Sequence, residues 1–178
     1  MALGNPTAPI ASPAAPRAPL EPSWRLMMSH PAHQLSFGFG SGLMRPAPGT
    51  WGTLFAWLVF VVIDPWLPDP AWAGVIVATF LLGAAAAERT GKALGRPDHG
   101  SIVIDEIVAF WLVLWLVPAG VLTQAVAFVG FRLFDIVKPP PIRAVDRRFK
   151  NGLGVMLDDL LAAFYTLLAA AVLTRLFA

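Results

Sequence analysis

The sequence predicts an all-α protein, a compact polytopic membrane bundle of about five short helices. Three observations favour this fold class. Apolar residues make up 57% of the 178 positions, and the mean hydropathy is +0.66. Charged residues account for only 13%, whereas roughly 25% is usual in soluble proteins. The apolar residues also form several long runs that short polar segments separate.

Composition excludes several kinds of site. There is no cysteine, which rules out disulfides, thiolate metal sites and a cysteine nucleophile. The only histidines are His30, His33 and His99, so a zinc site with several histidine ligands is not expected. The formal net charge of +2 is too small to indicate nucleic acid binding, and we expect no nucleic acid partner. The oligomeric state is left open.

The N-terminal segment differs from the rest of the chain. Residues 1–22 are rich in Pro and Ala and show no apolar periodicity, which predicts disorder. They lack the continuous apolar stretch of a signal peptide. We therefore divide the chain into a disordered N-terminal tail, residues 1–30, and a membrane-embedded domain, residues 31–178.

Five apolar stretches justify the predicted helices. In chain order they cover residues 51–67, 71–87, 102–117, 121–137 and 160–178. Most fall short of the roughly 20 residues that span a bilayer comfortably, and a buried helix of a soluble bundle would look similar. The low fraction of charged residues favours a membrane bundle over a soluble one, because a soluble domain of this size needs a polar surface. Some of the helices are therefore expected to be short or broken.

Connections that contain Lys and Arg alternate with connections that contain neither. The first connection and the turn at Pro118 have none. The other two connections are basic, with Arg89, Lys92 and Arg96 in one and Lys138, Arg143, Arg147, Arg148 and Lys150 in the other. This alternation predicts one topology, in which the N-terminal segment and both basic connections face the cytosol.

Five carboxylates lie at the rims of the apolar stretches: Asp105, Glu106, Asp135, Asp158 and Asp159. The predicted topology brings all of them to the cytosolic side, and ionisable side chains beside lipid are costly without a use. Carboxylates suit hard cations, so we expect all five to be catalytic residues that hold Mg²⁺. The alternative is solvated acids at helix N-termini, which the helix dipole favours. His99 is a candidate base or a polar loop residue.

Basic residues flank these carboxylates. Arg132, Asp135 and Lys138 are spaced three apart and share a helix face, and Pro139 ends that helix. The triple proline is expected to hold the following residues extended and to direct Arg143. We expect Arg132, Lys138 and Arg143 to bind a phosphate. The alternative is a structural Arg132–Asp135 pair with ordinary cytosolic charges.

A glycine-rich segment precedes the first long stretch. Residues 38–42 read Gly-Phe-Gly-Ser-Gly, and Pro48-Gly49-Thr50 follows. The spacing does not match a dinucleotide fingerprint. The segment could offer backbone N–H groups to a phosphate, with Ser41 and Thr50 as further phosphate-binding candidates, or it could be a flexible loop.

Four strings in this order carry a family resemblance. They are residues 38–42 with Pro48-Gly49-Thr50, Asp98-His99-Gly100-Ser101 with Asp105-Glu106, Phe131-Arg132 with Phe134-Asp135 and Lys138-Pro139, and Gly154 with Asp158-Asp159. Together they resemble the phosphatidylglycerophosphatase A family over residues 38–163. Thr53, Ala109 and Asn151 depart from the family pattern without removing a carboxylate.

The resemblance implies a Mg²⁺-dependent phosphatase of the bacterial inner membrane. Such an enzyme removes the terminal phosphate of phosphatidylglycerophosphate and yields phosphatidylglycerol. Water or an Asp could be the nucleophile, and the number of metal ions is open. Two rival interpretations remain: a phosphatase for another lipid phosphate, and a non-enzymatic membrane subunit or small transporter. The transporter should carry charges towards mid-membrane, whereas here they gather at one face.

Overall fold

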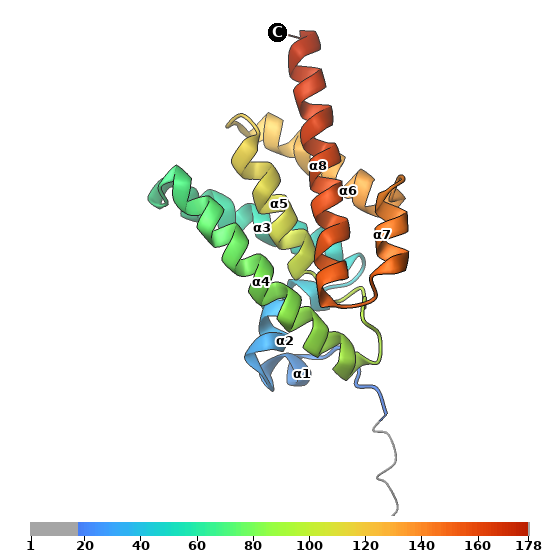
Figure 1. The fold of residues 1–178 in the computed structure, drawn as a ribbon. Helices are drawn as coiled ribbons and strands as arrows, with labels where there is room; N and C mark the ends of the chain where they lie inside the picture. The colour runs from blue at the N-terminus through green and yellow to red at the C-terminus, as the bar shows by residue number, and fades with distance from the viewer. Residues whose placement is uncertain (1–17, 178) are drawn as a thin grey trace, which may run out of the picture.

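The computed structural model describes residues 18–177, and all of their regular structure is helical (Figure 1). The elements in chain order are α1 (Trp24–Met28), α2 (Pro31–Ser36), η1 (Gly38–Leu43), α3 (Pro48–Ile63), η2 (Asp64–Trp66), α4 (Asp69–Leu94), α5 (Ile104–Leu116), α6 (Val121–Val137), α7 (Ile142–Arg148) and α8 (Gly152–Phe177). The prediction of an all-α bundle is confirmed, and each predicted apolar stretch corresponds to one of the helices α3, α4, α5, α6 and α8.

The helices differ in their ability to cross a bilayer. Within the described residues, three segments are long and apolar enough: Pro48–Trp66, Asp69–Leu94 and Gly152–Leu176. Helix α5 has 13 residues and is about 20 Å long, less than the roughly 30 Å of the hydrocarbon core. It is central instead, packed against α3, α4 and α8 (Figure 1). Neighbouring helices therefore surround α5, which is too short to span the bilayer by itself.

The outward-facing surface of the bundle is apolar. Large side chains that are more than half exposed include Leu58, Val62, Leu81, Leu82 and Val129. A soluble protein rarely exposes so many large apolar side chains on its helices, whereas lipid-facing helices must. The exposed side chains and the three long helices therefore agree with the predicted membrane bundle.

The N-terminal boundary needs a correction. Residues 1–17 of the expected tail lie outside the described residues, but Trp24–Met28 form helix α1. The Ser23 side chain accepts a hydrogen bond from the Leu26 N–H and caps this helix, and Leu26 and Met27 are buried in the core. The prediction of disorder is therefore wrong for α1, where one cap and two buried side chains suffice to order the chain.

Helix α8 begins earlier than expected. It starts at Gly152, so Asp158 and Asp159 lie in its second turn and not at its N-terminus. The Glu88 carboxylate accepts a hydrogen bond from the Gly152 N–H at 2.7 Å, and Asn151 Oδ1 accepts one from the Gly154 N–H at 2.8 Å. These two acceptors satisfy N–H groups that the first turn of a helix leaves free.

The triple proline also behaves differently from the prediction. Residues 139–141 form a turn, not an extended segment, closed by a 2.8 Å hydrogen bond from the Ile142 N–H to the Pro139 carbonyl. Ile142 is fully buried and anchors α7, which carries Arg143. The sequence left the glycine-rich segment open as a phosphate-binding segment or a flexible loop. Residues Gly38–Leu43 form the short 3₁₀ segment η1, with Phe39 and Gly40 in non-helical conformations.

Candidate active site

The chain brings the beginnings of α5 and α8 and the end of α6 to the same end of the bundle (Figure 1). Close backbone packing fixes where α5 begins. A Cβ at Gly42 would collide with the Ser101 carbonyl, and a Cβ at Gly52 would collide with Val103. The Val103 N–H donates to the Ser36 carbonyl at 2.8 Å. Helix α5 therefore starts at Ile104 and places its two acidic residues in its first turn.

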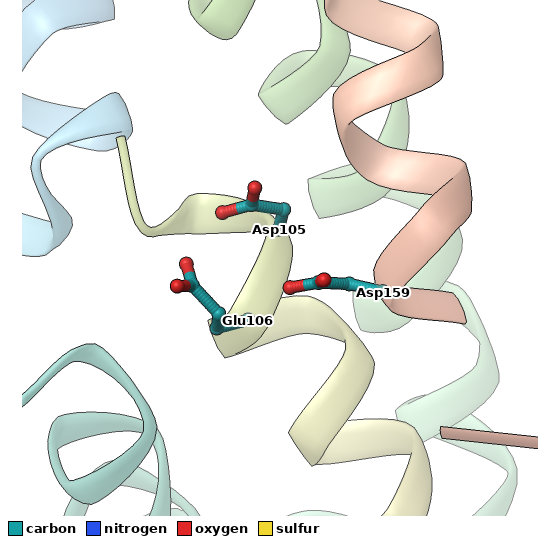
Figure 2. A group of neighbouring side chains, drawn as sticks. All are labelled: Asp105, Glu106 and Asp159. Carbon is teal, nitrogen blue, oxygen red and sulfur yellow. The ribbon is translucent and has the colours of Figure 1, made fainter. Parts of the chain in front are cut away.

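Three carboxylates converge there. Asp105 and Glu106 of α5 and Asp159 of α8 each offer an oxygen, and these oxygens lie within 4.8 Å of one another. Figure 2 shows the three carboxylates turned towards a common space between the two helices. Asp105 and Asp159 are buried, and the Glu106 side chain is 12% exposed. We call these three residues the carboxylate triad.

The triad has unused hydrogen-bonding capacity. Asp105 Oδ1, Glu106 Oε2 and Asp159 Oδ2 are buried, and none has a hydrogen-bond partner among the described residues. A buried carboxylate without a partner costs several kcal/mol. The donor set consists of carboxylate oxygens alone, which suits a hard cation such as Mg²⁺ better than zinc or copper. The residues present therefore fit the expected metal.

The remaining two predicted metal ligands each pair with a cation beside the triad. Asp135 pairs with Arg132, whose Nη1 lies 2.7 Å from Asp135 Oδ2 and 3.6 Å from Glu106 Oε1. Asp158 is buried and pairs with Lys138. Each of these two carboxylates thus pairs with a cation, but both lie next to the triad. Asp135 lies against Asp159 and Glu106, and Asp158 lies close to Asp105 and has one buried oxygen without a hydrogen-bond partner among the described residues.

Arg132 has a further partner that the sequence analysis did not include. Its Nη1 donates to Thr53 Oγ1 of α3 at 3.4 Å, while Thr53 donates to the Gly49 carbonyl. A Cβ at Gly49 would meet the Glu106 carboxylate and the Arg132 guanidinium where they now lie, so glycine lets these two side-chain ends pack directly against α3. The recurring small residues at the start of this helix are the sequence signal for that packing.

Lys138 ends α6 in a left-handed conformation with φ of 46°. Burial disfavours its charged form, but the adjacent Asp158 carboxylate outweighs this and raises the pKa of Lys138 above its usual value. Asp146 of α7 lies 3.7 Å from the ammonium group and was not among the predicted residues. Its signal was weak, because a lone acid within a basic segment resembles a surface residue.

The other predicted site residues lie outside the triad. His99 is half-buried, and its Nδ1 accepts a hydrogen bond from the Ser101 N–H at 3.1 Å. Burial, aided by Arg96 and Arg45, lowers the pKa of His99 below its usual value.

The phosphate-binding candidates outside α6 are also accounted for. Arg143 is exposed and donates to the Val137 carbonyl at 3.0 Å. Ser41 donates to the Gly38 carbonyl at 2.9 Å, and Thr50 is half-buried in the first turn of α3. The structure thus gives Arg143 and Ser41 local backbone partners and brings Arg132 and Lys138 beside the carboxylates.

The family of the chain follows from its relatives. A family model described as phosphatidylglycerophosphatase A matches residues 34–174. The chain is 41% identical over 148 residues to the phosphatidylglycerophosphatase A of Haemophilus influenzae, covering 83% of this chain and 91% of the relative. It is 41% identical over 139 residues to the protein of that name from Escherichia coli, covering 78% and 80%.

A third relative has a different name. The chain is 39% identical over 142 residues to a Bacteroides thetaiotaomicron protein provisionally named as a phosphatidylinositol-3-phosphatase, covering 76% of this chain and 88% of the relative. No solved structure gives a significant match. The family model matches most of the chain, and the two relatives of that name are matched over more than two thirds of both chains. These matches agree with the motifs of residues 38–159. The chain therefore belongs to the phosphatidylglycerophosphatase A family.

Proposed function

We propose that this protein is a Mg²⁺-dependent phosphatase that removes the terminal phosphate of phosphatidylglycerophosphate and yields phosphatidylglycerol. The observation that carries the proposal is the carboxylate triad with its unpartnered oxygens, flanked by Arg132 and Lys138. A phosphomonoester needs both features, a cation site and fixed positive charge around its oxygens. Family membership supplies the substrate class.

The triad would hold the metal in this mechanism. When bound, Mg²⁺ neutralises charge on the phosphomonoester and orients the attacking group. The Arg132 guanidinium and the Lys138 ammonium stabilise charge that develops on the equatorial phosphate oxygens. Asp135 orients Arg132, and Asp158 orients Lys138. Both cations are held before substrate arrives, which avoids reorganisation during the reaction.

The chemical balance of the reaction is simple. A new P–O bond forms to the nucleophile while the P–O bond to the glycerol oxygen breaks, and that oxygen takes a proton and leaves as the hydroxyl of phosphatidylglycerol. If water is the nucleophile, it loses the proton and inorganic phosphate is released directly. If an Asp is the nucleophile, water hydrolyses the aspartyl phosphate in a second step and releases inorganic phosphate. Water and an Asp carboxylate are both candidate nucleophiles. Acid quenching during turnover of ³²P-labelled substrate separates them. A labelled protein indicates an aspartyl phosphate, and an unlabelled protein indicates direct attack by water.

The test of function is phosphate release by purified protein with and without Mg²⁺. Phosphatidylglycerophosphate and phosphatidylinositol 3-phosphate should be compared, because one relative bears the name of an enzyme for the second lipid. We expect faster turnover of phosphatidylglycerophosphate and loss of activity on chelation. Preference for the other lipid would move the protein to a different substrate, and activity in excess chelator would remove the metal from the proposal.

The orientation belongs to the same proposal. We place the active site on the cytosolic side of a bacterial inner membrane, since the basic connections lie at the same end as the triad. Single cysteines can replace Asp98, Asn151 and Asp69 in this cysteine-free chain. In intact cells, an impermeant thiol reagent should label position 69 and spare positions 98 and 151. Labelling at 98 or 151 would reverse the topology.

A further inference from the structure

A groove of about 430 Å³ lies where α6 packs against α8. Its walls carry small side chains and threonines, among them Thr123, Ala127, Gly130, Thr166, Ala170 and Thr174. Its lining runs along nine residues of α6, from Leu122 to Gly130, a rise of about 12 Å. The groove is therefore elongated and parallel to the two helices that form it.

Two of the three threonines, both in α8, turn their hydroxyls to their own backbone and add little polarity to the groove. Thr166 donates its hydroxyl hydrogen to the Ala162 carbonyl at 2.8 Å, and Thr174 donates to the Ala170 carbonyl at 2.9 Å. Both hydroxyls are thus satisfied within α8. The Thr166 methyl group lies beside Gly130, 3.5 Å from where a Cβ would stand. The groove wall at this point consists of a methyl group and a bare backbone.

The groove leads away from the candidate active site along the same two helices. Gly130 precedes Arg132 by two residues, and Thr166 follows Asp159 by seven. At about 1.5 Å per residue, the groove begins roughly 10 Å from the triad along α8. Its near end therefore lies about half a helical turn from Arg132 along α6 and about two turns from Asp159 along α8.

We propose that this groove binds one acyl chain of the lipid whose headgroup phosphate occupies the site, an inference that rests on the proposed function. The groove runs for about 12 Å between α6 and α8, and its lining is mostly apolar. A single hydrocarbon chain whose headgroup lies at the triad would reach the near end of this groove, and the apolar lining matches it.

The test compares two Gly→Leu variants. At Gly130 a leucine side chain enters the groove, and its Cβ meets the Thr166 methyl only at ordinary contact distance. Gly74 is the matched control, because it lies on the exposed face of α4 with no atom of the described chain within 4 Å of a Cβ. Gly130→Leu should raise KM for dioleoyl phosphatidylglycerophosphate on the order of tenfold, as expected for a filled apolar pocket.

The same experiment also varies the length of the acyl chains of the lipid. The dihexanoyl form of the same lipid reaches the groove with little hydrocarbon, so Gly130→Leu should leave its kcat and KM nearly unchanged. Gly74→Leu should resemble the parent protein on both lipids. Equal effects of the two variants on the dioleoyl lipid would overturn the acyl-chain site. If the parent protein hydrolyses neither lipid, the proposed function has failed and the binding readout below decides the groove.

Photocrosslinking measures occupancy without turnover. A phosphatidylglycerophosphate with a diazirine midway along one acyl chain should label α6 and α8 residues of the groove in chelator, and Gly130→Leu should suppress that labelling. Labels spread evenly over the exposed faces of α3 and α4 would indicate bulk lipid and overturn the proposal. A dimer that Gly130→Leu dissociates would likewise overturn it, because a second copy would then fill the groove.

Discussion

The carboxylates at the two ends of the bundle differ in burial and in hydrogen-bond partners. At one end, Asp64 accepts a hydrogen bond from the Trp72 indole at 3.0 Å, and Asp69 accepts one from the Trp115 indole at 2.8 Å. Both acids are exposed to their surroundings. At the other end the triad is buried, with oxygens that lack a partner among the described residues. Carboxylates at the first end fasten helix termini, whereas those at the second have oxygens without a protein partner, as the proposed metal site requires.

This difference shows where buried carboxylates without partners lower the stability of the fold. A folded chain tolerates unpaired buried charge only where other packing holds it in place, and such positions cluster at functional sites. Helix α5 supplies that packing, since Ile104, Ile107, Val108 and Phe110 around the acids are all buried. Substitutions at the two ends should therefore separate activity from stability, and the predictions below use that contrast.

The largest effect is expected at the triad. Asp105→Asn and Glu106→Gln should each lower kcat/KM at least about a hundredfold, because loss of a charged ligand weakens a Mg²⁺ site of few carboxylates. The same variants should be as stable as the parent in chelator or more so, since each removes buried negative charge. Activity assays at low and high Mg²⁺ and thermal unfolding in detergent measure the two effects.

Metal binding gives an independent check on the triad. Mg²⁺ at 100 times its dissociation constant should stabilise the parent protein by about 2.7 kcal/mol. The Asp105→Asn variant should show little of this stabilisation at the same concentration. Turnover near that of the parent at low Mg²⁺ would show that the substituted residue is not a ligand.

The next largest effect concerns the buried ion pair. Lys138→Met leaves the Asp158 carboxylate, only 5% exposed, without its cation and should destabilise the protein by roughly 3 kcal/mol. Lys150→Met is the matched control, because the Lys150 side chain is 52% exposed where it pairs with Asp146. Exposed pairs contribute little to stability. Similar unfolding midpoints for both variants would mean that Lys138 does not stabilise the site.

The third effect concerns charge geometry at Arg132. A lysine keeps the charge but cannot reproduce the planar fork that lets arginine contact a carboxylate and a phosphate together. Arg132→Lys should therefore cost about 2 kcal/mol of transition-state stabilisation, roughly thirtyfold in kcat/KM. Arg148→Lys, at an exposed position of α7, should be nearly silent. Equal small effects would reduce Arg132 to a structural partner of Asp135.

Much of the fold could be predicted because membrane burial leaves a strong signal. Runs of apolar residues marked α3, α4, α5, α6 and α8, and turn residues marked the connection at Pro118. The ends of the helices were harder to predict from the sequence. The start of α8 depends on Glu88 and Asn151, two acceptors that come from different parts of the chain. Local sequence cannot reveal the Glu88 acceptor, which belongs to α4, whereas Asn151 directly precedes α8 and is a typical N-cap residue.

The candidate site was predictable in composition and less so in arrangement. The acids and bases could be chosen because charges are conspicuous in apolar segments. Their pairing depends on packing: Arg132 pairs with Asp135, Lys138 pairs with Asp158, and only the triad remains free of a cation partner as close as these. Thr53 was missed because a hydroxyl inside a helix usually bonds its own backbone, as this one also does.

The smallest effect is expected at the opposite end of the bundle. Trp115→Phe removes the indole donor of Asp69 while retaining an aromatic ring. Because this hydrogen bond is exposed, its loss should cost at most about 1 kcal/mol of unfolding free energy. kcat/KM should stay at the parent value, since Trp115 lies near the far end of α5 from the triad. Thermal unfolding and phosphate release on the same preparation measure both quantities. A large loss of activity with unchanged stability would show that the two ends are coupled, and the division between fastening and functional carboxylates would fail.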